Sequence, residues 1–473
     1  MEVSVRQVAL EMAVAGATAK DGTFSLYDGT GKLVSDNDLN GNTVTLTRNA
    51  DGTVNTVIDA AGRTALTFGY TSGQLTQVTD ASGRTVGFGQ TGGNLTSATD
   101  VLGQVETYAY DGQSHLTGRT DKNGNTWSVA YDANGRWDQE TDPAGNTESA
   151  SYDNQGQATV FTDKRGEPQL TTYNSTGNPL SVTDPSGNTK TSTWDANFDK
   201  LTQTDGRGNT TTYTYDTLGI PTSQTDPDYG SYSWVYGPNS RPTTIQTPIT
   251  TTTNAYDANG NLLTSKNGSN NTTSYTYLPT GQLATVLAPG NTVATSFAYN
   301  PDGTTQSLTD PTGAKTSFAY DGAGHLTQLT DPAGHTRTLV VDARGQVQSM
   351  KDALGNQTSF TYDAIGNRLS LTDPSGAKTA FVYDGLNRLT TRTDAQNHTW
   401  TTVYDPAGNV LSRTDANGHS SAYAYDQSGR LITMTDALGN VSSTGSRHSA
   451  GAASARATAT LAVPKAGYRH GPG

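Results

Sequence analysis

Apolar and polar residues alternate along short segments of the chain, and turn signals bound each segment. Aromatic pairs two positions apart recur, as in Phe360/Tyr362 and Tyr423/Tyr425, with Thr, Ser or Ala at the intervening positions. Period-two spacing of this kind is typical of a β-strand with one apolar face. The pattern therefore predicts short strands that bury the aromatic face and leave the Thr/Ser face in water.

Two kinds of turn signal separate these segments. Asp363-Ala364-Ile365-Gly366 follows a tyrosine, and Asp373-Pro374-Ser375-Gly376 follows a threonine further along the chain. Asp can accept a local backbone N–H, Pro suits the fixed φ of the second position, and Gly tolerates φ > 0 at the fourth. Each signal predicts a type I turn closed by a left-handed residue, in a three-residue hairpin loop with a G1 bulge.

This unit of two turn signals repeats along nearly the whole chain. Its tyrosine positions lie mostly 21 residues apart between Tyr110 and Tyr425, with Trp194 and Val341 in place of two tyrosines. Weaker copies precede the series at Tyr27, Asn49, Tyr70 and Gln90. A period held this long indicates an array of one supersecondary unit.

The repeat sets the expected fold class, which is all-β with tandem antiparallel β-hairpins. A lone two-stranded hairpin is marginal in water, so each unit must pair with the next and extend a sheet. Right-handed strand twist keeps such a sheet from lying flat, and we expect it to spiral. We predict about 20 hairpin units over residues 23–442, degenerate before residue 105, between an irregular segment at 1–22 and a non-repeat tail at 443–473.

Composition supports a folded repeat and narrows the classes of partner. Apolar residues make up only 32% of the chain, but charged residues make up only 15% and there are 23 tyrosines, which argues against disorder. The net charge of -13 comes without a basic patch, so nucleic acid is not an expected partner. The chain has no cysteine and no long apolar run, so we expect neither disulfides nor a membrane span. Arg6, Gln7 and Glu11 interrupt the apolar start, which makes it a poor signal peptide.

The aspartates of the turns are the most tempting catalytic candidates. Asp142 and Asp153 stand in matching settings, each before a turn glycine. General acid and base work needs two carboxylates in different environments, whereas this environment recurs about twenty times. Turn formation demands such repetition and catalysis does not, so we interpret both residues as structural.

Other candidate sites have equally plain interpretations. The seven histidines lack ligand spacing and are interpreted as solvent-facing turn and strand residues: His115, His325, His335, His398, His419, His448 and His470. Asp36 to Gly41 imitates the start of an EF-hand loop, but Thr47 stands where the bidentate Glu should be. No phosphate loop and no Gly-x-Ser-x-Gly elbow is present. The sequence therefore predicts no catalytic residue, no cofactor-binding residue, no metal ligand and no cofactor.

The consensus Tyr-Asp-x-x-Gly-x-Leu followed by Thr-Asp-x-x-Gly-Asn-x-Thr resembles the YD repeat of the Rhs proteins. Good copies are YDAIGNRLSLTDPSGAKT at 362–379 and YDGAGHLTQLTDPAGHT at 320–336. The relatives include bacterial Rhs and wall-associated toxins, the insecticidal Tc toxin complexes and animal teneurins. The resemblance implies a hollow shell of β-hairpins, which in bacterial members encloses a toxic C-terminal domain. It also implies a toxin cargo and secretion machinery as partners, and a secreted or cell-surface location.

The chain departs from this family pattern at its C-terminal end. Nothing matches the plug segment with self-cleavage aspartates, and the repeat breaks after Val441. A truncated or frame-shifted gene end and a flexible tail both explain the break. Twenty hairpins without a plug are too few to close a large cavity, so we expect an incomplete, open wall.

Two functions are compatible with the sequence. The first is a non-enzymatic scaffold, a fragment of the shell that encapsulates and delivers a toxin absent from this chain. The second is a cell-surface adhesion protein that binds carbohydrate through exposed aromatic residues, for which Trp194, Trp234 and Trp400 are candidates.

Overall fold

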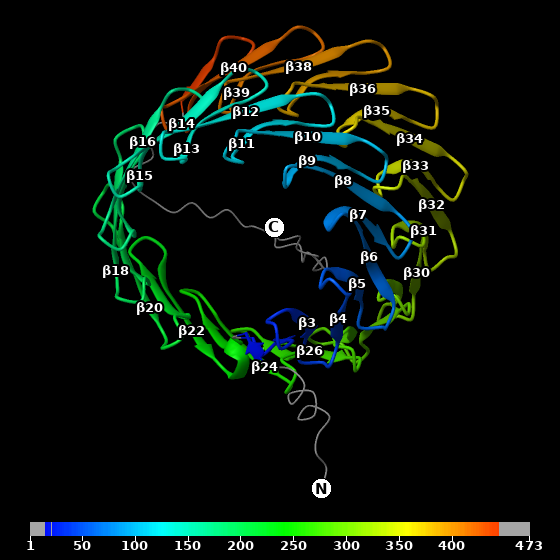
Figure 1. Cartoon of the computed structure of the whole chain (residues 1–473). Coiled ribbons are helices and arrows are strands. Elements are labelled where there is room, and N and C mark those ends of the chain that lie inside the picture. Colours follow the sequence, from blue (N-terminus) through cyan, green and yellow to red (C-terminus); the bar gives the residue numbers. More distant parts are fainter. Residues whose placement is uncertain (1–14, 20, 444–473) are drawn as a thin grey trace.

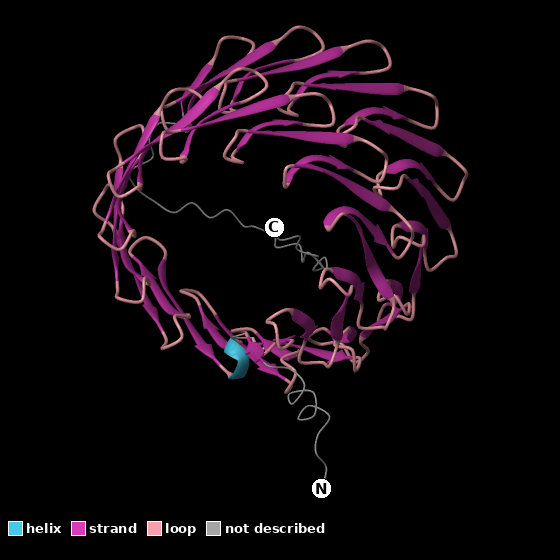
Figure 2. Cartoon of the chain, viewed as in Figure 1, coloured by secondary structure: helices cyan, strands magenta, loops and turns pink. Residues whose placement is uncertain are grey.

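The computed structural model of the protein describes residues 15–19 and 21–443. These residues form one sheet of 42 strands and a single 3-10 turn, η1 (Pro238–Ser240). Each strand pairs antiparallel with the next in the sequence, from the pairing of β1 with β2 to that of β41 with β42. Figure 2 shows strands along the whole path of the described chain. The predicted all-β fold of antiparallel hairpin repeats is confirmed.

Odd-numbered and even-numbered strands play different parts in the repeat. The odd-numbered strands are β1 (Ala15–Thr18), β3 (Leu33–Asn37), β5 (Val54–Ile58), β7 (Gln74–Asp80), β9 (Asn94–Thr99), β11 (Leu116–Thr120), β13 (Trp137–Thr141), β15 (Ala158–Thr162), β17 (Pro179–Thr183), β19 (Lys200–Thr204), β21 (Pro221–Asp226), β23 (Pro242–Gln246), β25 (Leu262–Lys266), β27 (Leu283–Leu287), β29 (Thr305–Thr309), β31 (Leu326–Thr330), β33 (Val347–Lys351), β35 (Arg368–Thr372), β37 (Leu389–Thr393), β39 (Val410–Thr414) and β41 (Leu431–Thr435).

Most of the even-numbered strands carry the tyrosine of the repeat at or near their last residue. They are β2 (Phe24–Tyr27), β4 (Thr43–Arg48), β6 (Thr64–Thr71), β8 (Thr85–Thr91), β10 (Val105–Tyr110), β12 (Thr126–Tyr131), β14 (Thr147–Tyr152), β16 (Pro168–Tyr173), β18 (Thr189–Trp194), β20 (Thr210–Tyr215), β22 (Gly230–Tyr236), β24 (Thr251–Tyr256), β26 (Thr272–Tyr277), β28 (Thr295–Tyr299), β30 (Lys315–Tyr320), β32 (Thr336–Val341), β34 (Gln357–Tyr362), β36 (Lys378–Tyr383), β38 (Thr399–Tyr404), β40 (Ser420–Tyr425) and the short β42 (Val441–Ser443).

The sheet is therefore a long strip with a different kind of loop along each of its two edges. We call the loops that follow odd-numbered strands TD loops and those that follow even-numbered strands YD loops. In the TD loop after β13, the Gly145 N–H donates to the Asp142 carbonyl over 2.9 Å, and the Asp142 N–H donates to the Asn146 carbonyl over 2.9 Å. Gly145 has φ 84°, in the left-handed region that favours glycine. The type I turn closed by a left-handed residue is thus confirmed.

A β-bulge next to nearly every YD loop gives the strip its curvature. Beside the YD loop after β14, Tyr152 pairs with Ala158 while Ser151 pairs with Val160, so one residue of β15 is extra. The pairing of β13 with β14, across a TD loop, has no such shift. A bulge bends its strand and increases the local twist. Because the bulges repeat along one edge, the strip coils.

The coil passes beyond one full turn, so its second turn lies against its first. Figure 1 shows β10, β12 and β14 of the first turn beside β36, β38 and β40 of the second. Hydrogen bonds join the two turns between residues about 220 to 260 positions apart, such as Asn123 with Asp363 and Ser186 with Ser428. All of these bonds run from TD loops of the first turn to YD loops of the second. We call this contact line the seam: the TD loops after β3–β17 against the YD loops after β24–β40.

The sheet is a single layer, and its side chains are accordingly half-buried. Among large and small apolar residues of the described chain, only Ala150 is buried, and it is still 7% exposed. The aromatic face was expected to be buried, yet Phe360 and Tyr362 are only half-buried. The reason is that no second layer covers the strip, so each aromatic ring packs only against neighbours in its own sheet.

The segment expected to be irregular, residues 1–22, contains one strand. β1 pairs with β2 through its backbone from Ala15 to Thr18, although its small side chains give no strand signal. Residues 1–14 and the predicted tail from 444 to 473 lie outside the described residues. In the described part of the chain, no helix has the length and apolar character needed to cross a membrane.

Candidate functional site

In most repeats the tyrosine hydroxyl bonds across the open end of the hairpin that a TD loop closes. The Tyr152 hydroxyl donates to the Trp137 carbonyl over 2.6 Å, and the Tyr362 hydroxyl donates to the Val347 carbonyl over 2.9 Å. In both cases the acceptor is the first residue of the preceding odd strand, 15 residues earlier. The same bond is made by Tyr131, Tyr173, Tyr215, Tyr236, Tyr277, Tyr383, Tyr404 and Tyr425.

Other side chains make this bond where tyrosine is missing. The Trp194 indole N–H donates to the Pro179 carbonyl over 2.8 Å, and the Gln90 amide donates to the Leu75 carbonyl over 2.8 Å. The bond thus needs a hydrogen-bond donor of sufficient reach and not an aromatic ring as such.

One of the weaker repeat copies was placed wrongly by one residue. The sequence pattern predicts Asn49 as the tyrosine position, but its N–H donates to the Thr53 carbonyl, which makes it the first residue of a YD loop. Arg48 holds the tyrosine position, and its guanidinium donates to the Leu33 carbonyl over 3.0 Å. An arginine in place of the tyrosine leaves no aromatic signal in the sequence, so the shift could not be seen there.

Asp142 and Asp153 lie in two separate loops at opposite edges of the sheet, with β14 between them. Oδ1 of Asp142 accepts the N–H groups of Ala144 and Asn146 at 3.0 and 2.9 Å. Oδ1 of Asp153 accepts the equivalent N–H groups of its own loop at 2.9 Å each. Each carboxylate therefore closes its own turn.

The two aspartates differ in their surroundings. The Asp142 side chain is fully buried on the seam edge, and Lys164 Nζ lies 3.4 Å from its Oδ2. Burial raises the pKa of Asp142, but hydrogen bonds from Asn146 and the charge of Lys164 outweigh it and hold the pKa below its ordinary value. Asp142 and Asp153 have equivalent places in their turns, but only Asp142 is buried at the seam and paired with Lys164.

The described histidines serve the same loops. Nδ1 of His115 lies 2.9 Å from Asp111 Oδ2, and His325, His335, His398 and His419 repeat this contact with the aspartate four residues earlier. Asn146 and Arg136 make the equivalent contact at the same loop position. The histidine is therefore one of several donors that satisfy the second carboxylate oxygen. His448 and His470 lie outside the described residues.

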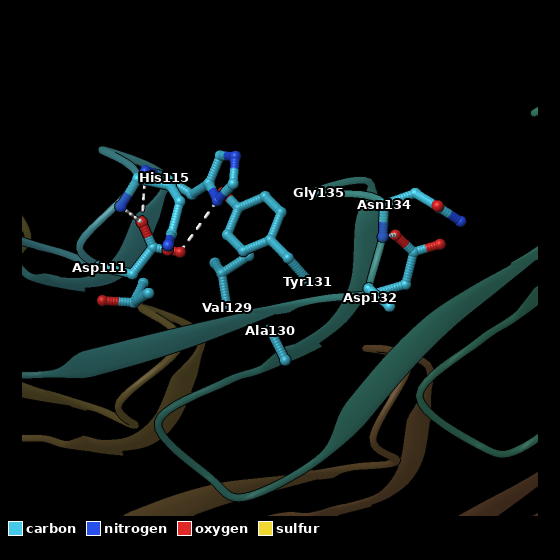
Figure 3. A pocket seen from close by; sticks show the side chains of 11 residues that line it. Asp111, His115, Val129, Ala130, Tyr131, Asp132, Asn134 and Gly135 are labelled. Atoms are coloured by element: carbon cyan, nitrogen blue, oxygen red, sulfur yellow. Dashed lines mark hydrogen bonds and ion pairs between the residues drawn. The ribbon is translucent and has the colours of Figure 1, made fainter.

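A hollow lies between two successive YD loops on the first turn (Figure 3). It has a volume of about 590 Å³ and lies between the loops after β10 and β12. The His115 ring stacks on the Tyr131 ring, with centroids 4.7 Å apart. Asp111 and His115 could form an acid-base pair, but no serine or cysteine lines the hollow as a nucleophile. The arrangement fits loop packing, because the same Asp–His pair recurs in four other loops.

The remaining candidates from the sequence also fall on ordinary repeat elements. Asp36 lies in β3, and Asp38 opens a TD loop by accepting the N–H groups of Asn40 and Asn42. Thr47 lies in β4 and bonds to Thr56 on the next strand. Within residues 15–19 and 21–443, no three His, Cys, Asp or Glu residues group as metal ligands.

Cations cover several of the aromatic rings that could have stacked on sugars. The Arg392 guanidinium lies 4.0 Å from the Trp400 ring centroid, and Lys200 Nζ lies 5.3 Å from that of Trp194. Trp234 is half-buried in β22. These contacts account for the rings by packing and cation–π attraction within the sheet.

Within the described residues, the seam joins residues that are distant in the sequence. Arg84 Nη1 lies 3.0 Å from His325 Nε2 and donates to the Ala343 carbonyl over 3.0 Å. Arg344 forms an ion pair with Asp100, which also binds Lys122. Sequence reasoning missed the seam because its partners lie some 240 residues apart and share no motif.

An open, single-layer coil of hairpins, whose recurring side chains bond to the backbone of their own repeat, defines a repeat scaffold. The chain contains RHS repeats: the RHS Repeat family model matches residues 92–126, 115–147, 299–336, 341–378, 366–399 and 404–441. No curated protein matches the sequence significantly. The matched segments fall in both turns of the coil.

Solved structures support the same fold. The chain is similar to the crystal structure of TcdB2-TccC3, with a TM-score of 0.63 and 16% sequence identity over 87% of this chain and 29% of that one. It is also similar to the crystal structure of TcdB2-TccC3-Cdc42, with a TM-score of 0.60 and 16% identity over 88% of this chain and 23% of that one. The chain thus spans about a quarter of the length of these structures, and the likeness concerns the fold.

Proposed function

We propose that the chain is a non-enzymatic section of an RHS shell wall that encloses a toxin domain. The observation that carries this proposal is the seam, because it turns a coiled strip into a continuous wall. Ion pairs and hydrogen bonds close the line between turns at several loops, such as Arg344 with Asp100 and Asn123 with Asp363.

The fold likeness to TcdB2-TccC3 supports this proposal, as does the repeat shared with the RHS family. Since the chain spans about a quarter of those structures, it would supply one part of a larger wall. The partners that follow are a toxin cargo and a secretion machinery, and the location that follows is secreted or at the cell surface. The wall itself would carry no catalytic residue.

Protease protection of an enclosed polypeptide tests the proposal. An unfolded, protease-sensitive peptide is joined to the C-terminal end of the full chain. The matched control is the same fusion with Arg165→Ala and Arg344→Ala, which remove two cross-seam side chains. We expect the peptide to be cleaved more slowly in the native fusion than in the control. Equal cleavage rates in both fusions would contradict enclosure by this wall.

A further inference from the structure

The coil leaves one free edge on each side of the seam. The seam uses the TD loops after β3–β17 and the YD loops after β24–β40. The opposite edges carry the same two kinds of loop: YD loops after β2–β20 on the first turn, and TD loops after β19–β41 on the second. We call these the free YD rim and the free TD rim. The molecule thus presents, on opposite sides, the two surfaces that bind each other within it.

The free TD rim is unusually apolar. The four most exposed large apolar side chains of the described residues all lie on it: Tyr229 at 74%, Ile249 at 93%, Leu354 at 88% and Leu438 at 88% exposed. Leu102 has the same loop position as Leu354 and Leu438, two residues after the aspartate, but its loop belongs to the seam. It is only 41% exposed. Packing of the second turn against the first thus covers a position that the free rim leaves open to water.

The two free rims also carry opposite charges. Arginine or lysine side chains lie on the free YD rim and aspartates lie on the free TD rim, as in the ion pairs of the seam. Across the seam, Arg430 of a YD loop reaches Asp184 of a TD loop at 3.7 Å while it also holds its own Asp426. On the free YD rim, Arg136 has the same loop position and holds its own Asp132 in the same way. Lys32 has this position in another loop of that rim.

Aspartates line the facing surface. Asp331 and Asp415 open loops of the free TD rim, and their side chains are 41% and 43% exposed. Asp184 and Asp100, which open TD loops of the seam, are 29% and 13% exposed and pair with arginines of the next turn. The free TD rim therefore presents exposed carboxylates that make no contact across a seam, and carboxylates of this kind bind the arginines of a YD loop within the molecule.

We propose that the free TD rim of one molecule docks on the free YD rim of a second copy, so that the seam is repeated between molecules. The two surfaces differ, which makes the contact heterologous and head-to-tail. A heterologous contact that does not close into a ring continues to grow with concentration. The wall would thereby lengthen by whole chains.

Mixing variants of the two rims tests this docking. The TD-rim variant is Leu354→Glu with Leu438→Glu, and the YD-rim variant is Lys32→Glu with Phe198→Glu, where Phe198 is 56% exposed. By sedimentation velocity, the native chain should associate beyond dimers as its concentration rises. Each variant alone should remain monomeric, and an equimolar mixture should form dimers and stop there, because each partner supplies one intact rim.

A control separates the rims from exposed apolar surface in general. Val340→Glu with Val382→Glu changes two side chains that are 57% and 54% exposed on strand faces, away from both rims. This variant should associate as the native chain does, and circular dichroism checks that all variants keep the sheet. A native chain that stays monomeric, rim variants that associate as the native chain does, or a mixture without dimers would each overturn the proposal.

Discussion

At the scale of the residue, one aspartate closes the turn of each of many loops, and its side chain is buried in some loops and exposed in others. It accepts two backbone N–H groups in both kinds of loop, as Asp142 and Asp153 show. The seam buries Asp121 and Asp142, whereas the Asp331 side chain on the free TD rim is 41% exposed. The stability contributed by an aspartate should therefore depend on how deeply its loop is buried.

Replacing Asp142 and Asp153 separately with alanine tests this dependence. Asp153→Ala removes two hydrogen bonds to exposed backbone and should cost about 1 kcal/mol, as for a lost helix cap. Asp142→Ala also leaves Lys164 and the Asn146 amide without their buried partner, and should cost roughly 2 to 3 kcal/mol. Urea unfolding of the two variants measures both values. Equal costs would contradict the burial of Asp142 by the seam.

The same aspartates predict where the protein loses stability in acid. Hydrogen bonds in the loops hold the pKa of many of them below the ordinary value of 3.8. For Asp205, burial raises the pKa, but hydrogen bonds from Asn209 and Arg207 outweigh it and lower the pKa to about 2. A folded-state pKa below the unfolded value contributes stability that is complete above the unfolded pKa and lost as pH falls through the folded pKa.

The melting temperature should therefore hold steady from neutral pH down to about pH 5 and fall between roughly pH 4 and pH 2. Scanning calorimetry across this range measures it. A decline that begins near neutral pH would show that other groups, and not the loop aspartates, control the acid response.

At the scale of the element, the hairpin is held by its tyrosine as well as by its strand pairing. The hydroxyl bonds across the open end of the TD hairpin and fixes successive YD loops relative to each other. This bond explains why tyrosine recurs with the period of the repeat, and why Trp194 and Gln90 can replace it. Val341 has no donor and cannot make it.

Removing a single hydroxyl tests this role. Tyr362→Phe should lower the free energy of unfolding by about 1 kcal/mol, because the Val347 carbonyl loses its side-chain donor. Tyr320→Phe is the matched control, since the described part of the chain shows no such bond from Tyr320. Thermal or urea unfolding compares the two variants. A cost in Tyr320→Phe as large as that in Tyr362→Phe would mean that ring packing, and not the bond, sets the tyrosine period.

At the scale of the whole molecule, the local pattern was predictable from the sequence and the assembly of turns was not. The positions of the loops and strands follow from residues within one repeat. Gly145, for example, marks a turn because the turn requires a positive φ, which is 84° at this residue. The weak copy at Arg48 was misplaced because an arginine took over the hydrogen bond of a tyrosine. The absence of catalytic residues remains a prediction, supported by the repetition of every candidate.

The seam had no signal in the sequence because it depends on curvature summed over many hairpins. Each bulge beside a YD loop adds a small bend, and only after about 240 residues do two loops meet, as do those of Asp100 and Arg344. A change of a few degrees per hairpin would bring a different loop to each position. The expectation of an open sheet is confirmed. The sequence did not predict that the loops of successive turns would contact each other.

Cross-linking across the seam tests whether the second turn of the coil lies against the first. Ser186 Oγ and Ser428 Oγ lie 2.9 Å apart, on a TD loop of the first turn and a YD loop of the second. The chain has no cysteine, so Ser186→Cys with Ser428→Cys creates the only thiol pair. Ser186→Cys with Ser375→Cys is the control, because Ser375 lies on the free TD rim.

After mild oxidation, the Ser186/Ser428 variant should form an intramolecular disulfide, lose both free thiols and migrate faster on a non-reducing gel as a monomer. The Ser186/Ser375 variant should keep its thiols. Retention of both thiols in the Ser186/Ser428 variant, at the level seen in the control, would contradict a coil whose second turn lies against its first.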